Sequence, residues 1–303
     1  MKKTDTQRYF TFISFVLIGL LFFGCAAKVP IWGNEEAGFN LQYRLDDGQK
    51  LDYQITTKSI QQYEIMNQKN TADDDVTITL TLVGSPADKP DQLTGQVTVD
   101  DMKMKTIQSA MGESGEIERD LSKVIGKSFE LVFTPQGKET DYPGIENLTI
   151  DMGPTAGGEQ SIRNRFTNIL PDLSNNPVKI GEPWTSVFDE TTPAMGGTSS
   201  VKINTTSKID GYDTVNGYEC VKISSQSTGT LDVSAEMMSM PYTIDGDITG
   251  ESTWYFAYKK GLLVKSSDKS SIKSKLSVGG EQGISGPLDI NGSNDVILTT
   301  PAS

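Results

Sequence analysis

Alternation of apolar and polar residues is the feature that most limits how this chain can fold. Leu51, Tyr53 and Ile55 alternate with polar residues, and the same period of two recurs in 76–82, 93–99, 129–133 and 201–205. A period of two places apolar side chains on one face of a β-strand and polar side chains on the other. We therefore predict a mainly β protein with a long, curved, half-barrel-like antiparallel sheet.

Turn residues separate these alternating segments. Turns are expected at 46–48, 135–137, 216–217 and 259–261, each of which ends in glycine. The pair Asn216-Gly217 is the strongest hairpin signal, because both residues tolerate the positive φ angles of a tight two-residue turn.

Two segments depart from the alternation and carry helical spacing. Residues 115–126 and 158–170 place apolar residues at i, i+4, i+7 and i+8. This spacing gives one apolar stripe on a helix. We expect two short amphipathic helices on the concave face of the sheet, with stripes made by Ile117, Leu121, Val124 and Ile125, and by Ile162, Phe166, Ile169 and Leu170.

The N-terminus has the organisation of a secretory signal. Lys2, Lys3 and Arg8 precede an apolar run at 10–23, and small residues follow it. We predict a signal peptide at 1–24. The uncharged stretch 9–27 leaves a retained membrane anchor as the alternative.

The end of this run resembles a bacterial lipobox. The letters LFFGC end at Cys25, and Phe22 stands where that pattern usually has leucine. The resemblance implies that Cys25 is acylated with palmitate-type chains and begins the mature protein, with 25–38 as the lipidated N-terminus and tether. Several acyl chains hold a protein durably on a membrane. Ala26 follows Cys25 where an aspartate would resemble an inner-membrane retention signal of enterobacteria. This favours the outer membrane of the cell envelope, on its periplasmic or its surface side.

Composition excludes several functions. The chain has no histidine, which removes Ser-His-Asp and Cys-His catalysis and histidine-ligated zinc or haem. Its formal net charge of −13 opposes binding to phosphate backbones, so no nucleic-acid partner is expected. Cys220 is predicted to be a small buried residue. No catalytic residue, cofactor or metal site is assigned, and we expect a protein that is not an enzyme.

Four motifs carry a family resemblance. They are GKSFELVFTPQG at 126–137, LPDL at 170–173, VKIGEPW at 178–184 and VNGYECVKI at 215–223. They resemble an uncharacterised family of bacterial lipoproteins with a domain of unknown function, over most of 39–278. The architecture is similar to the lipoprotein-carrier superfamily, in which a curved sheet half-wraps an apolar cavity closed by helices. From the pattern of strands we predict one β-rich domain at 39–303. The aromatic strands that precede Gly137 and Gly261 are loosely alike, which leaves open two similar halves at 39–150 and 176–278 joined by a helical connector.

Acidic and glycine-rich segments allow other interpretations. The carboxylates at 73–75, and Asp245 and Asp247 with Glu251, are either solvated turn residues or calcium ligands. No single carboxylate pair stands out for glycoside hydrolysis. The glycine-rich segment 153–158 lacks the ending of a phosphate-binding loop and is expected to be a mobile loop over the mouth of the sheet.

Methionines suggest the leading hypothesis for function. Met102 with Met104, and Met238 with Met240, would each place two thioethers on one face of a strand, as core filler, as an adaptable lipid lining or as Cu(I) ligands. We predict a cell-envelope lipoprotein that binds or carries an apolar ligand or lipid in the groove. The alternative is a non-catalytic surface structural or adhesion module with a fully packed core. The expected lining is Met102, Met104, Phe166, Met238, Met240, Trp254 and Phe256.

Overall fold

A computed structural model describes residues 31–65, 68–110, 113–152, 158–194, 197–237, 240–279 and 283–302. The predictions for the signal peptide, Cys25, Met238 and residues 153–157 of the glycine-rich loop lie outside this part. Trp32 to Ser303 make up one compact unit. Within the described ranges, no helix has the length and apolar character needed to cross a bilayer.

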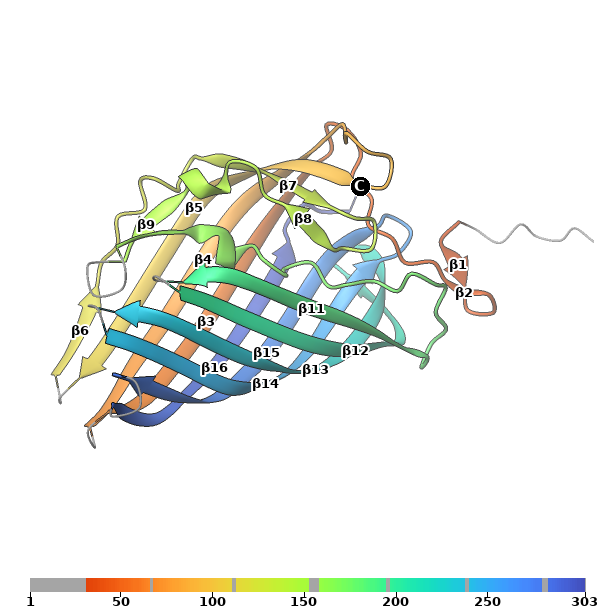
Figure 1. Cartoon of the computed structure of the whole chain (residues 1–303). Helices are drawn as coiled ribbons and strands as arrows, with labels where there is room; N and C mark the ends of the chain where they lie inside the picture. The colour runs from red at the N-terminus through yellow and green to blue at the C-terminus, as the bar shows by residue number, and fades with distance from the viewer. Residues whose placement is uncertain are drawn as a thin grey trace, which may run out of the picture. The chain divides into compact units, whose positions relative to one another are not determined.

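Long antiparallel strands dominate the structure, which confirms the predicted fold class of a mainly β protein with a long curved sheet (Figure 1). The strands of the main sheet are β3 (Lys50–Ile65), β4 (Gln68–Ser85), β5 (Leu93–Ala110), β6 (Glu113–Ile117), β7 (Ser128–Phe133), β8 (Glu139–Asp141), β11 (Pro183–Ala194), β12 (Gly197–Val215), β13 (Tyr218–Met237), β14 (Met240–Ala257), β15 (Leu262–Val278) and β16 (Ile284–Leu298). The five alternating segments lie in β3, β4, β5, β7 and β12.

Two meanders share this 12-stranded sheet. Strands β3 to β8 form one meander and β11 to β16 form the other, and they join where β16 pairs antiparallel with β3. The first and last long strands therefore lie side by side in the middle of the sheet. Its edges are β11 on one side and β8, with β6 on β5, on the other.

A connector at 142–182 runs from the edge strand β8 to the opposite edge strand β11 (Figure 1). It contains the 3-10 turns η1 (Ile145–Asn147) and η3 (Ile162–Arg165), and the short paired strands β9 (Thr149–Asp151) and β10 (Glu159–Ser161). We call the sheet face against which it packs the inner face, and the opposite one the outer face.

The predicted tether is ordered in its described part. Strand β1 (Gly33–Asn34) pairs with β2 (Gly38–Phe39), and Phe39 exchanges two backbone hydrogen bonds with Val178 of the connector. The Phe39 side chain is 1% exposed. The segment from Gly33 onward is therefore part of the folded unit.

The helix predicted at 115–126 is wrong. Its first residues belong to β6, which pairs with β5, and only Leu121 to Ile125 form a single turn that ends at Gly126 with φ of 72°. A helix this short is marginal by itself, whereas the edge of a sheet offers unpaired backbone groups to the same residues. Val124 is still buried, while Ile125 remains 37% exposed.

The helix predicted at 158–170 is also wrong in type. The segment forms β10 and then η3, which Phe166 follows, and Asn168 has a left-handed φ of 58° that no α-helix accommodates. Its predicted docking is nevertheless confirmed, because Ile162 and Phe166 are 2% and 1% exposed and Ile169 packs against the core. Spacing identified the buried residues but not the backbone that buries them.

The predicted turns are confirmed where glycine provides a positive φ. Asn216 and Gly217 have φ of 51° and 82° and connect β12 to β13 in a two-residue hairpin. The other three turns end in glycines with positive φ: Gly48, Gly137 and Gly261.

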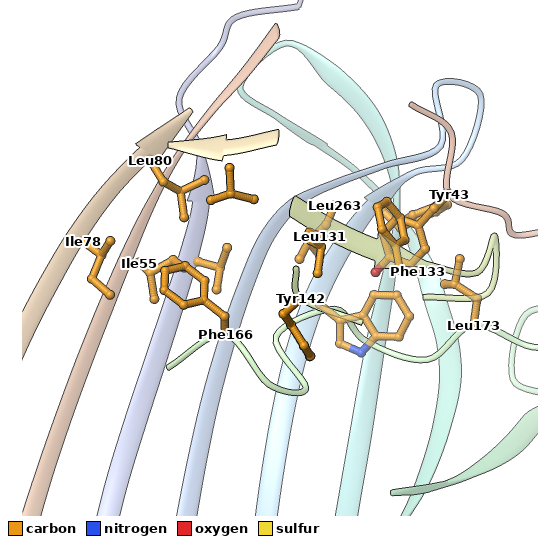
Figure 2. Packing of buried hydrophobic residues seen from close by; sticks show 14 of the residues in the cluster. Tyr43, Ile55, Ile78, Leu80, Leu131, Phe133, Tyr142, Phe166, Leu173 and Leu263 are labelled. Carbon is orange, nitrogen blue, oxygen red and sulfur yellow. The ribbon is translucent and has the colours of Figure 1, made fainter. Parts of the chain in front are cut away.

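The main core lies between the connector and the inner face (Figure 2). It is at the end of the strands where β7 pairs with the first residues of β5. Phe166 of the connector meets Phe129 of β7 edge to face with ring centroids 4.9 Å apart. Trp184 and Trp254 make a similar contact at 6.2 Å. Such aromatic pairs contribute beyond the area that they bury.

Candidate functional site: a cleft beneath the connector

A cleft of about 280 Å³ opens between the connector and the inner face of β11 to β16. The connector contributes Asn168, Ile169, Pro171 and Asp172 to one wall. The opposite wall consists of successive inner-face residues from six adjacent strands. Because both walls come from the same folded unit, the cleft is a feature of the tertiary structure rather than of any one segment.

Strand register arranges the inner wall in tiers. An upper, mainly apolar row crosses the strands as Ile209, Ile223, Trp254, Ser266 and Val296. Two polar rows follow, the first made of Ser207, Ser225, Ser252, Asp268 and Asn294 and the second of Thr205, Ser227, Gly250, Ser270 and Gly292. A lower, aliphatic row contains Ile203, Gly229, Ile248, Ile272 and Ile290. We call the two polar rows the hydroxyl belt.

Hydroxyl groups of the belt bond to one another. Ser207 Oγ and Ser225 Oγ lie 2.7 Å apart, and the Trp254 indole donates to Ser225 Oγ at 3.0 Å. Thr205 Oγ1 and Ser227 Oγ are 2.8 Å apart. A hydroxyl has one proton and two lone pairs, so hydroxyls bonded in pairs still have acceptor capacity for a ligand.

Asp268 is the carboxylate of the belt. Burial raises its pKa to about 6, although hydrogen bonds from Ser266, Asn294 and Ser252 oppose the shift. Ser266 Oγ donates to Asp268 Oδ2 at 3.1 Å. The belt continues onto β3, where Thr57 donates to Asn294 Oδ1 at 2.9 Å. The carboxyl of Asp268 thus titrates closer to neutral pH than an ordinary aspartate does.

Glu139 of β8 holds the connector wall in place. Its Oε1 accepts the backbone N–H groups of Ile169 at 2.9 Å and Leu170 at 3.0 Å, and its Oε2 accepts that of Asn168 at 2.5 Å. The Tyr142 hydroxyl donates to Oε2 at 3.0 Å. Burial raises the pKa of Glu139 to about 7 despite these four hydrogen bonds. One side chain therefore fixes the residues that line the cleft.

A second, mainly apolar cavity lies within the main core, between Phe166 of the connector and the inner face of the sheet. Its volume is about 50 Å³, and Leu80, Val97, Phe129, Phe166 and Leu263 are among its lining residues. Liquid water occupies about 30 Å³ per molecule, so this space cannot accept an acyl chain. The core above the belt is closely packed in this structure.

The residues predicted to line a groove do not form one continuous surface. Trp254 lies at the upper limit of the cleft, and Phe166 lies beside the small apolar cavity. Met102 and Phe256 are 2% and 0% exposed in the main core, against which Met104 packs. Met240 is 47% exposed at the start of β14, and Met238 lies outside the described residues.

The candidate site residues that sequence analysis missed are the hydroxyl belt, Asp268 and Glu139. The only available signal was the run of serines and threonines at alternating positions in β12, β13 and β14. Such residues also occur on solvated strand faces. Their position on the inner face became clear only from the cross-strand register.

The acidic clusters lie within strands, not in turns as expected. Asp245, Asp247 and Glu251 face Lys275, Lys273 and Lys269 across the β14–β15 pair. Asp75 pairs with Lys58 at 3.0 Å, and Asp74 accepts a hydrogen bond from Thr106 at 2.6 Å. Among the described residues, no group of three His, Cys, Asp or Glu side chains is arranged to hold a metal ion.

Cys220 is fully buried with a free thiol, as predicted. Burial raises its pKa to about 11, so the thiol is protonated at neutral pH. A protonated, inaccessible thiol is a poor nucleophile. Cys220 therefore acts as a small core residue.

Comparisons with known proteins give little guidance. No protein-family model and no curated protein matches this sequence. Among solved structures, Pseudomonas aeruginosa OccK5 (OpdH) is similar at 7% identity and a TM-score of 0.23, over 85% of this chain and 100% of that chain. Pseudomonas aeruginosa OccK11 (OpdR) is similar at 6% identity and a TM-score of 0.15, over 85% of this chain and 99% of that chain. Similarity at this level carries no conclusion about this protein.

Proposed function

We propose that this protein is a non-catalytic cell-envelope lipoprotein, anchored by acyl chains on Cys25, that binds a lipid in the cleft beneath its connector. The observation that carries the proposal is the order of the tiers on the inner wall. The polar belt lies next to Ile203 and Ile248 of the aliphatic row within one cleft of about 280 Å³. That order matches an amphipathic molecule with a polar group and an apolar chain.

The aliphatic region continues beyond the cleft along the inner face. Val201, Leu231 and Ile244 are half-buried there, and Val233 and Tyr242 form a separate apolar cluster with their neighbours. An apolar chain that starts at the belt would cover this surface. Removing apolar area from water gives roughly 25 cal/mol per Å², so even a partly covered chain contributes several kcal/mol to binding.

Binding can be tested by titrating the protein with a dansyl-labelled fatty acid. Ile203 faces the cleft and Asn204 is its neighbour on the outer face. We expect saturable binding by the wild type, at least about tenfold weaker binding by Ile203→Asp because a charge is placed against the chain, and unchanged binding by Asn204→Asp. Thermal unfolding of both variants checks that the fold is intact.

A second function is favoured by the packing of the main core. The apolar cavity of only about 50 Å³ suits a non-catalytic structural or adhesion module. Native mass spectrometry of gently extracted protein separates the two. Copurified lipid supports the carrier, whereas absence of lipid together with no saturable binding of the probe supports the structural module.

A further inference from the structure

The outer face has a hollow of its own. It measures about 770 Å³ and crosses β11 to β15 on the side opposite to the cleft. Four lysines border it, namely Lys208, Lys222, Lys265 and Lys269. Such a local concentration of positive charge is unexpected in a chain with a formal net charge of −13.

Strand register spaces these lysines around the hollow. Lys222 of β13 and Lys265 of β15 both lie opposite Tyr255 of β14. Neighbouring strands are about 4.8 Å apart, which places Lys222 and Lys265 roughly 10 Å apart. Lys269 follows Lys265 on the same side of β15, at roughly 13 Å along the strand. The lysines surround the floor and do not gather at one point.

Lys222 and Lys265 supply the positive charge that is available to a ligand. Lys208 pairs with Asp210 at 3.6 Å. In the described ranges, Lys222, Lys265 and Lys269 make no ion pair with a carboxylate. Among the described lining residues, Glu251 is the one carboxylate, and it lies opposite Lys269 across the β14–β15 pair. The excess positive charge of the hollow therefore rests on Lys222 and Lys265.

The floor between the lysines is polar and uncharged. It consists of one amide and several hydroxyl side chains: Gln226, Thr206, Ser224, Thr253 and Ser267. Hydroxyl and amide groups both donate and accept hydrogen bonds, as the hydroxyls of a sugar do. A simple inorganic anion would use only the donors.

The hollow continues into a second one of about 690 Å³ that reaches β3. The two share Gln226, Glu251 and Lys269, and the second adds Lys58, whose charge is already paired with Asp75. Together they extend from β11 to β3. This length suits an extended chain better than a small molecule.

We propose that these joined hollows bind an anionic glycan, a polysaccharide that bears phosphate or sulfate groups. The lysine ammonium groups attract the anionic substituents, and the hydroxyl and amide floor bonds the sugar hydroxyls. The site is on the opposite face from the lipid cleft, so this proposal does not depend on the proposed function.

Titration of the full-length protein in an uncharged detergent with dextran sulfate tests this proposal. We expect saturable binding that weakens with added salt, and no binding of neutral dextran at the same concentration. Lys222→Glu with Lys265→Glu should weaken the affinity for dextran sulfate at least about tenfold. The matched control is Lys69→Glu with Lys127→Glu, which changes two exposed lysines outside the hollows by the same charge and should leave the affinity within about twofold.

Several results would overturn the proposal. If the control pair weakens the affinity for dextran sulfate as much as Lys222→Glu with Lys265→Glu does, the attraction comes from the net charge of the protein and not from the hollows. Binding of polyglutamate or double-stranded DNA as tight as that of dextran sulfate would exclude recognition of a glycan. Absence of dextran sulfate binding by the wild type would exclude the site itself, whatever the outcome of the lipid titration.

Discussion

The Glu139 carboxylate makes stability depend on pH, and Glu139→Gln isolates that dependence. Burial raises the pKa of Glu139 from 4.5 to about 7 in the folded protein. Because the folded pKa is the higher one, the folded state holds a proton that the unfolded state releases between these values. The contribution to stability is complete below the unfolded pKa and is lost as the pH rises through the folded pKa.

The magnitude follows from the size of this shift. Each pKa unit corresponds to about 1.4 kcal/mol. The unfolding free energy therefore falls by about 3 kcal/mol as the Glu139 carboxyl ionises, and most of this loss occurs between about pH 5 and pH 8. Glutamine stays uncharged, and its oxygen can still accept the N–H groups of Ile169 and Leu170, which bond to Oε1 in the wild type. Its amide faces the Asn168 N–H, with which it cannot bond, and that lost bond costs roughly the same at every pH.

Urea unfolding of wild type and Glu139→Gln at several pH values measures the difference. We expect the wild type to lose about 2–3 kcal/mol of unfolding free energy relative to Glu139→Gln between about pH 5 and pH 8. Glu130→Gln replaces an exposed glutamate of β7. Its unfolding free energy should change with pH in parallel with that of the wild type. If the Glu139→Gln and wild-type curves are also parallel, the Glu139 carboxyl does not titrate in this range, which contradicts the prediction.

The remaining predictions concern the connector and the N-terminus. Phe166 is 1% exposed against Phe129, so Phe166→Ala should destabilise the protein by about 3–5 kcal/mol and lower the thermal midpoint by many degrees. The same substitution at the half-exposed Ile125 should have little effect, and a near-zero change for Phe166→Ala would mean that the connector does not depend on this contact. Cys25→Ser should abolish acylation and release the protein from membranes, as checked by fractionation and intact mass. A wild type without lipid mass and a variant still in the membrane fraction would indicate an uncleaved anchor instead.

Much of the fold could be predicted from the sequence because its signals are local. Alternation at Leu51, Tyr53 and Ile55 states which face of a strand is buried, and the pair Asn216-Gly217 states where a hairpin turns. The helical spacing at 162 and 166 identified residues that do reach the core. The helices themselves failed, because short helices are marginal and the sheet edge and connector offered the same backbone other hydrogen bonds.

The features that only the tertiary structure decided depend on strand register and on contacts between residues far apart in the sequence. Alternation does not say that β16 pairs with β3, nor that Ser207, Ser225 and Ser252 align in one row. A shift of one residue in pairing would move every side chain of a strand to the other face. The hydroxyl belt and the lysine-bordered hollow therefore exist only in this register, and Glu139 meets the connector only because the chain crosses the sheet between its two edges.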